Sequence, residues 1–460
     1  LRDTSAVQEL VRRLEAFDAA ISEPAQLEIV TALAKIGGAT AAQAFEGLFR
    51  RHPPTGANDD GATSRALQES WRLGRQAPAA RLAAYARDAQ GEWRRNAVYS
   101  AARLRLAGAA QGLLDASGDQ DPLTRQWAAR SLTAELADSA RVARESFVGR
   151  LRQLVGDSDA QVRTNALQAL ASYRDSTLVS VASSRLVDRD QNVPVRAATT
   201  LGALGGSRAA ALLAERFTQQ GTFAVRRAAL QALAQAGPGA VLRTGQPWRA
   251  DPDWRLRAAY AEALGIAATP EARADLVALL GDADARVVAA ALGAIAQFVP
   301  AGDTALRSLA RVRLAHEDVM VRAGAVEILA RERDPALLPD LVAAYRRAAS
   351  EPMNDARLAA VQALAQLAGT GPPARERVER DFLGSVGRSA DDLVRRAVAE
   401  GFGLATHERY WGAVFPVATG RNAQDYQELV RRYLLPLPGS APLRLRRIHQ
   451  RAPGHEPVLP

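Results

Sequence analysis

The chain has 460 residues, of which 48% are hydrophobic, 24% are charged and only 5% are aromatic. This length exceeds the size at which a single hydrophobic core stops growing, so it excludes a one-core domain and favours several domains or a repeat array. The absence of cysteine excludes disulfides and thiolate metal sites. No apolar run approaches the roughly 18 residues of a membrane-spanning helix, so no membrane span is expected.

The formal net charge is +9, which raises the question of nucleic-acid binding. The basic residues are almost all arginine, however, since Lys35 is the only lysine among 59 basic residues. A bias of this kind more often reflects the base composition of a genome than a ligand. We therefore expect a solvated surface of mixed charge.

One phrase recurs along the chain and predicts a helix at each occurrence. Its clearest copy is Val162-Arg163-x-x-Ala166-x-x-Ala169-Leu170, in which apolar residues at offsets 0, 4, 7 and 8 form one helical stripe. From Trp93 onward the copies start 30 to 38 residues apart, which is the length of a helix-turn-helix repeat. In chain order, the copies begin at Ala25, Ser64, Trp93, Thr124, Val162, Val195, Val225, Leu256, Val287, Val321, Ala356 and Val394, and the copy at Val195 carries one extra residue.

A second predicted helix precedes each copy, as in residues 209–217, 275–280 and 337–344. Glycine and aspartate punctuate the turns between helices, as in Gly156-Asp157-Ser158-Asp159, because glycine suits a helix C-terminus and aspartate suits the next N-cap. An aspartate also lies four residues before the arginine of several phrases, where the arginine can bridge to that aspartate or to its counterpart in the adjacent repeat. These pairs are Asp121 and Arg125, Asp159 and Arg163, Asp253 and Arg257, Asp318 and Arg322, and Asp391 and Arg395.

The phrase Asp-x-x-Val-Arg-x-x-Ala-x-x-Ala-Leu resembles the HEAT-repeat family, including the bacterial repeats related to phycobilisome lyases. The resemblance covers roughly residues 1–403. It implies an all-α fold, a right-handed α-α superhelix of about eleven or twelve helical pairs, in which the five Asp–Arg pairs form a structural ladder between repeats. Val288 replaces the arginine after Asp284, so the ladder should be interrupted there.

Both ends depart from the repeat. The first ten residues align with 329–338, the end of one repeat and the start of the next, so we expect the sequence to be a fragment. Residues 404–436 are rich in aromatic residues and are expected to form a C-terminal cap, with a binding platform as the alternative. Residues 437–460 contain linker-like Pro and Gly and are expected to form a disordered tail.

A second resemblance rests on the segment from Tyr410 to Pro416 and on the tyrosines Tyr426 and Tyr433. This segment resembles bacterial proteins in which a HEAT array precedes a cyclophilin-type peptidyl-prolyl isomerase domain. The phrases that build a cyclophilin site are missing after Pro436. The resemblance therefore implies a non-catalytic arm of a larger enzyme.

No motif predicts catalysis, and we expect no catalytic residue, no cofactor site and no metal site. The five histidines do not share a helix face at i, i+4, and neither a phosphate-binding glycine loop nor a nucleophile elbow occurs. HEAT-like proteins that excise DNA bases would need a basic groove, yet offset 6 of the phrase is neutral or acidic in most copies. If these offset-6 residues face the concave side, they are the candidate partner-binding residues: Gln168, Gln231, Glu262, Glu327, Gln362 and Glu400.

The sequence thus predicts a non-catalytic scaffold that binds a protein or peptide on a concave helical surface. The first alternative is an accessory arm of a prolyl isomerase, and the second is nucleic-acid binding through arginine clusters such as Arg226-Arg227. The sequence does not distinguish a cytoplasmic protein from an exported one, and it does not fix the oligomeric state.

Overall fold

The computed structural model describes residues 6–15, 22–57, 60–217, 221–383, 393–394 and 397. The regular secondary structure of these residues is helical, and no strand occurs among them. The chain divides into two compact units, Leu1–Trp248 (unit 1) and Arg249–Pro460 (unit 2), each of which is described by itself. The expected all-α repeat fold is confirmed.

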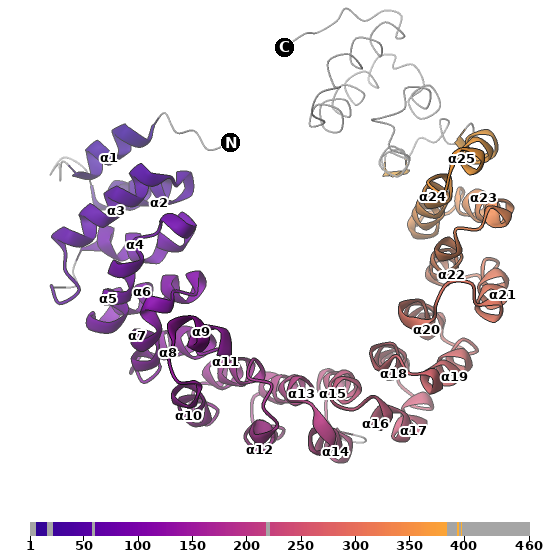
Figure 1. Cartoon of the computed structure of the whole chain (residues 1–460), viewed down its shortest axis with the longest axis horizontal. Coiled ribbons are helices and arrows are strands. Elements are labelled where there is room, and N and C mark those ends of the chain that lie inside the picture. The colour runs from indigo at the N-terminus through magenta and orange to yellow at the C-terminus, as the bar shows by residue number, and fades with distance from the viewer. Residues whose placement is uncertain are drawn as a thin grey trace, which may run out of the picture. The chain divides into compact units, whose positions relative to one another are not determined.

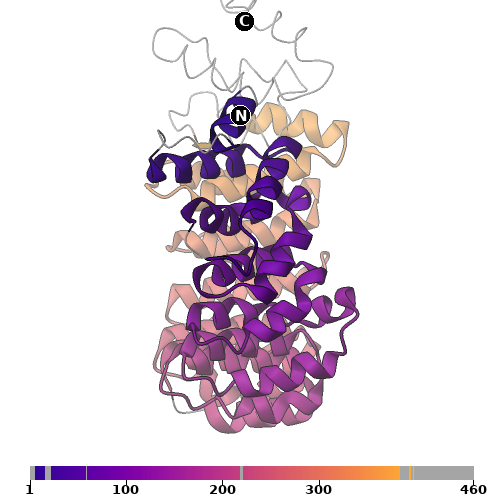
Figure 2. The same ribbon diagram turned by 90° about the vertical axis from the view of Figure 1, so that its left-hand side faces the viewer.

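Unit 1 consists of two layers of helices (Figure 1). The inner helices, which pack one against the next on the inside of the unit's bend, are α2 (Glu23–Ile36), α4 (Gly61–Glu69), α6 (Gly91–Leu104), α8 (Pro122–Ser131), α11 (Ala160–Ala171), α13 (Asn192–Leu204) and α15 (Phe223–Ala236). The outer helices are α1 (Val7–Glu15), α3 (Ala39–Arg51), α5 (Ala79–Asp88), α7 (Ala110–Ala116), α9 (Ala134–Ala140), α10 (Arg144–Leu154), α12 (Val179–Ser183), α14 (Gly206–Phe217) and α16 (Pro238–Arg243). Figure 2 shows the helices of this unit stacked one above the next.

Unit 2 repeats the same two-layer arrangement (Figure 1). Its inner helices are α18 (Trp254–Ala267), α20 (Ala285–Phe298), α22 (Val319–Glu332) and α24 (Asp355–Ala368), and its outer helices are α19 (Pro270–Leu279), α21 (Thr304–Arg313), α23 (Leu338–Ala348) and α25 (Pro372–Val378). The short helix α17 (Gly245–Arg249) spans the boundary between the units. Short 3₁₀ turns at Ser70–Gln76, Ala107–Ala109, Ser176–Leu178 and Pro335–Leu337 and a π-helical turn at Glu379–Leu383 complete the described elements.

The recurring phrase forms the inner helices. In α11, Val162, Ala166 and Leu170 are fully buried, as the apolar stripe predicts. The aspartate before the phrase is the N-cap, and its carboxylate accepts a backbone N–H from the first turn in α4, α8, α11, α18, α20 and α22. These six inner helices therefore begin where their aspartate caps place them.

Helix α13 differs from the expected register. The sequence starts this copy at Val195 with an extra residue, but the buried positions of α13 match those of α11 when Val193 is aligned with Val162. In this alignment Pro194 takes the place of Arg163, and no extra residue is needed. The proline lies in the first turn of the helix, where a missing N–H is tolerated.

The ladder arginines connect the loops of consecutive repeats. Arg163 donates two hydrogen bonds to Asp188, from Nε at 3.0 Å and from Nη2 at 2.6 Å, while its Nη1 donates to the carbonyls of Asp157 and Ser158 in its own loop. Both partners are almost completely buried, with 4% of each side chain exposed. One guanidinium thus holds its own loop and the next loop together.

The same arrangement recurs, with a carboxylate from the following repeat as the partner. Further rungs are Arg94 with Asp119, Arg125 with Asp157, Arg257 with Asp282, and Arg322 with Glu351. The structure differs here from the expected pairing with the capping aspartates Asp121, Asp159, Asp253 and Asp318 or their counterparts. When the partner of a rung is an aspartate, a second aspartate follows it two residues later in the same loop. Asp157, for example, precedes the capping residue Asp159. Asp391 and Arg395 lie outside the described residues.

The difference arises because the two carboxylates of such a loop bind different groups. The capping carboxylate of Asp159 accepts the N–H of Val162 at 2.9 Å. The carboxylate of Asp157 accepts the N–H of Asp159 at 2.9 Å and the fork of Arg125, also at 2.9 Å. The earlier aspartate therefore fixes the loop and receives the guanidinium, and the later one starts the helix.

Small residues allow neighbouring inner helices to approach closely. A Cβ atom on Gly202 of α13 would lie 2.8 Å from the Cα of Ala232 on α15, and one on Gly265 of α18 would lie 3.1 Å from the Cα of Ala294 on α20. These glycines occupy equivalent positions in the two units. The alanine-rich composition is thus a condition of the helix spacing.

We predict that Arg163→Ala lowers the free energy of unfolding by about 3 kcal/mol or more, because it leaves the buried carboxylate of Asp188 without its charged partner. The matched control is Arg144→Ala, which removes a similar fork to Asp138 whose two side chains are about half exposed, at 51% and 54%. This control should cost far less than Arg163→Ala, because solvent screens an exposed ion pair. Urea unfolding followed by circular dichroism measures both, and equal losses would contradict a structural role for the buried rung.

The ladder also predicts a pH dependence. The hydrogen bonds from Arg257 hold the pKa of Asp282 below its usual range, although burial acts in the opposite direction. A carboxylate with a lowered pKa stabilises the fold above its unfolded value of about 3.9, and this contribution is lost as the pH falls through the folded value. At pH 7 the unaltered chain should therefore melt at a higher temperature than the Asp282→Asn variant. The difference between the two melting temperatures should shrink below about pH 4. A difference that is unchanged down to about pH 2 would refute this linkage.

Candidate functional site

From α6 onward, one position on each inner helix points away from both layers, and we call this set the solvent-facing column. Gln168 illustrates it, because it is exposed although its neighbours Leu167 and Ala169 are buried. The column contains Tyr99, Arg130, Gln168, Thr199 and Gln231 in unit 1, and Glu262, Gly293, Glu327 and Gln362 in unit 2. The candidate residues from the sequence thus lie at equivalent places, and Glu400 lies outside the described residues.

The candidate residues differ in exposure. Gln168, Glu327 and Gln362 are exposed, and they make no hydrogen bond or ion pair within the described part of the chain. Gln231 and Glu262 are half-buried and engage neighbouring groups. Other polar residues of the inner helices serve the fold, as Thr200 does by donating to the carbonyl of Leu167 at 2.9 Å. The polar side chains of the column are therefore the ones that packing does not require.

Tyr99 and Arg130 were missed as column members, although the same offset from Trp93 and Thr124 leads to them. Thr199 was missed because the register of α13 was misplaced. With these residues included, the described column of unit 1 contains an aromatic residue, a cation and neutral side chains, and the two acidic residues Glu262 and Glu327 belong to unit 2. The chemical character of the column therefore changes along the chain.

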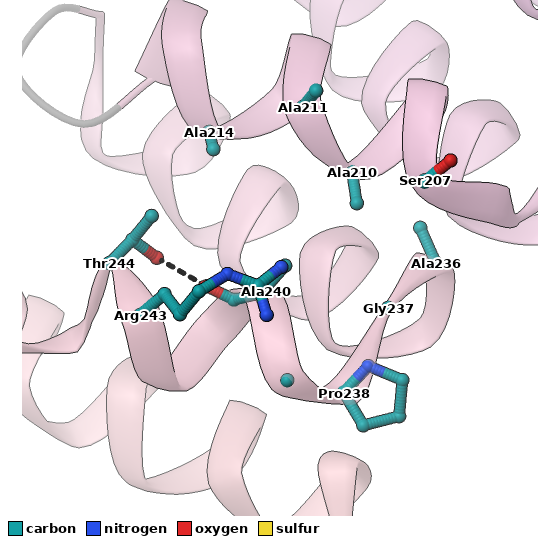
Figure 3. A pocket seen from close by; sticks show the side chains of 11 residues that line it. Ser207, Ala210, Ala211, Ala214, Ala236, Gly237, Pro238, Ala240, Arg243 and Thr244 are labelled. Carbon is teal, nitrogen blue, oxygen red and sulfur yellow. Dashed lines mark hydrogen bonds between the residues drawn. The ribbon is translucent and has the colours of Figure 1, made fainter.

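A cleft of about 460 Å³ lies in unit 1 between α14 and α16 (Figure 3). Ala210, Ala211 and Ala214 line one wall, and the segment from Pro238 to Thr244 lines the other. The Thr244 hydroxyl donates to the carbonyl of Ala240 at 3.0 Å, so it is used within its own helix. The lining contains neither a carboxylate nor a histidine.

The described histidines have structural surroundings. His316 Nδ1 accepts the backbone N–H of Asp318 at 3.0 Å, which completes the loop before α22. The ring of His52 packs edge-on against Trp93, with 6.4 Å between the ring centroids. Within the described ranges, no group of three or more histidine, aspartate or glutamate side chains could hold a metal ion. In the same residues, no helix has both the length and the apolar character needed to cross a membrane.

Comparison with known proteins agrees with this geometry. Residues 149–234 match the family model of HEAT repeats. A search of curated proteins found no match. The HEAT-repeat resemblance is confirmed, whereas the relation to phycobilisome-lyase repeats and to cyclophilin fusions stays a prediction. The aromatic segment behind the latter lies outside the described residues.

Solved structures of importin beta and of Kap95p have a similar fold. A crystal structure of importin beta shares 13% identity and a TM-score of 0.56, over 98% of this chain and 67% of that one. A structure of Kap95p binding to RanGDP shares 13% identity and a TM-score of 0.52, over 96% of this chain and 72% of that one. A Kap95:Nup1 complex shares 14% identity and a TM-score of 0.52, over 98% and 62%. At these identities the likeness concerns the fold alone.

Proposed function

We propose that this chain is a non-catalytic scaffold that binds a protein or peptide segment along the solvent-facing column of its inner helices. The observation that carries the proposal is the set of polar side chains that the fold leaves unused: Gln168, Glu327 and Gln362 are exposed and make no internal bond in the described part of the chain. Side chains of this kind can exchange water for a partner at little cost to the fold.

The repeat architecture supports the same proposal. From α6 onward, stacked helical pairs place one column position on each inner helix, so a partner segment that follows the column meets a new position at every repeat. Because each unit has its own column, each can bind a segment by itself. The similar fold of Kap95p, whose structures describe binding to RanGDP and a complex with Nup1, is consistent with protein binding.

To test the proposal, peptides that bind the whole chain are first selected from a random displayed library, and their dissociation constants are then measured. The triple variant Gln168→Arg, Glu327→Arg, Gln362→Arg should weaken the selected peptides at least tenfold, because arginine changes both the size and the charge of the column. Its melting temperature should stay close to that of the unaltered chain.

The control triple places arginine at exposed positions of outer helices, Gln111 on α7, Gln153 on α10 and Glu271 on α19, with the same change in charge. This control should leave the dissociation constants unchanged. Equal weakening by the two triples would place binding outside the column. Catalytic turnover of a proline-containing peptide by the purified chain would contradict the non-catalytic part of the proposal.

A further inference from the structure

The N-terminal part of the column in unit 1 carries a group of three aromatic and three arginine side chains, which we call the arginine–aromatic patch. It consists of Trp71, Arg72, Tyr99, Arg103, Trp127 and Arg130. Trp71 and Arg72 follow α4 in the 3₁₀ turn Ser70–Gln76, Tyr99 and Arg103 lie on α6, and Trp127 and Arg130 lie on α8. These inner elements are neighbours in the stack, so the patch is continuous.

Guanidinium groups and rings alternate within the patch. The Arg103 guanidinium lies 3.7 Å from the centroid of the Trp71 ring and 5.6 Å from that of Tyr99. Arg72 lies 4.5 Å from the centroid of Trp71, and Arg130 lies 5.9 Å from that of Trp127. The rings of Tyr99 and Trp127 meet edge to face, with 4.7 Å between their centroids and 82° between their planes. Such contacts hold the arginine side chains in place.

The charge of the patch is not balanced from within the described part of the chain. Arg72 forms an ion pair with Glu69 at 2.5 Å. Arg103 and Arg130 are exposed, and their only described partners are the aromatic rings. A guanidinium held through its face keeps the N–H groups along its edge available, and these groups form a fork that matches a carboxylate. Within the described residues, the guanidinium groups of Arg103 and Arg130 thus lie beside aromatic rings and pair with no carboxylate.

We propose that the arginine–aromatic patch binds an acidic peptide segment in extended conformation. This inference rests on the proposed protein-binding function and names the chemistry of the partner at this site. Neighbouring packed helices are about 8–10 Å apart, and an extended chain advances about 3.3 Å per residue. Carboxylates three residues apart in the peptide therefore match arginines on adjacent helices α6 and α8, and the apolar residues between them contact the rings.

The geometry favours a peptide over a single-stranded nucleic acid. Stacking of a base requires a free ring face. The Trp71 ring already holds guanidinium groups, with Arg103 at 3.7 Å and Arg72 at 4.5 Å from its centroid, and Tyr99 and Trp127 pack against each other. The next column residues of unit 1 are Gln168, Thr199 and Gln231, so no cation continues the column as a phosphate backbone would require.

The test uses the full chain and three fluorescent probes: a 15-residue peptide with glutamate at every third position and proline or alanine elsewhere, the same peptide with lysine in place of glutamate, and a 15-nucleotide oligothymidine. The glutamate peptide should bind at least tenfold more tightly than the other two probes. The double variant Arg103→Gln, Arg130→Gln should weaken it at least tenfold.

The control double variant Arg152→Gln, Arg208→Gln removes the same charge from exposed positions on the outer helices α10 and α14 of the same unit, and it should bind the glutamate peptide like the unaltered chain. Circular dichroism melts confirm that each variant is folded. Equal binding of the glutamate and lysine peptides, tighter binding of oligothymidine, or equal effects of the two double variants would each overturn the proposal. The column triple could weaken binding of the library-selected peptides while the Arg103→Gln, Arg130→Gln variant binds the glutamate peptide as the unaltered chain does. This result would support the scaffold function and refute only the arginine–aromatic patch as a binding site.

Discussion

The structure depends on an arginine whose guanidinium is shared between two consecutive loops. In the complete form of this contact, one edge of the guanidinium binds the carbonyls of its own loop and the other binds a carboxylate of the next, as Arg163 and Arg257 do. Because the fork is bidentate, it fixes the direction as well as the distance between repeats. The carboxylate of an aspartate partner such as Asp157 also accepts a backbone N–H of its own loop. The two ends of such a rung are therefore both held by hydrogen bonds.

The apolar layers and the ladder have different roles. Alanine and leucine bury the surface between helices, and close contacts such as that of Gly202 with Ala232 set how near the inner helices lie. These contacts alone are non-directional. The forks provide the direction, and they lie in the loops, which leaves the middle of each inner helix free to present a column residue. This separation explains why the residues of the column can vary in charge while the fold stays regular.

The periodicity of the sequence was sufficient to predict the inner helices, the aspartate caps of α8, α11, α18 and α22, and five positions of the column, because each depends on local spacing. The partner of each arginine was not predicted, since two aspartates two residues apart compete for it and only the three-dimensional path of the loop distinguishes them. The register of α13 was misplaced because Val195-Arg196 has the Val-Arg sequence of the phrase. In the structure, Val193 and Pro194 occupy those two positions. The arginine–aromatic patch was overlooked because its members lie on three elements, and no single repeat shows the alternation.

The rungs have a mechanical consequence. Each fork joins only neighbouring repeats, so a load applied to the ends of a unit passes through one rung and one helix contact at a time. The repeats are then loaded in series, so the weakest contact between two neighbouring repeats opens first. Helix α13 presents Pro194 and helix α20 presents Val288 where α11 presents Arg163. In unit 2, the ion pair of Arg273 with Asp303 spans the joint beside α20. Under tension, unit 1 should therefore yield first beside α13.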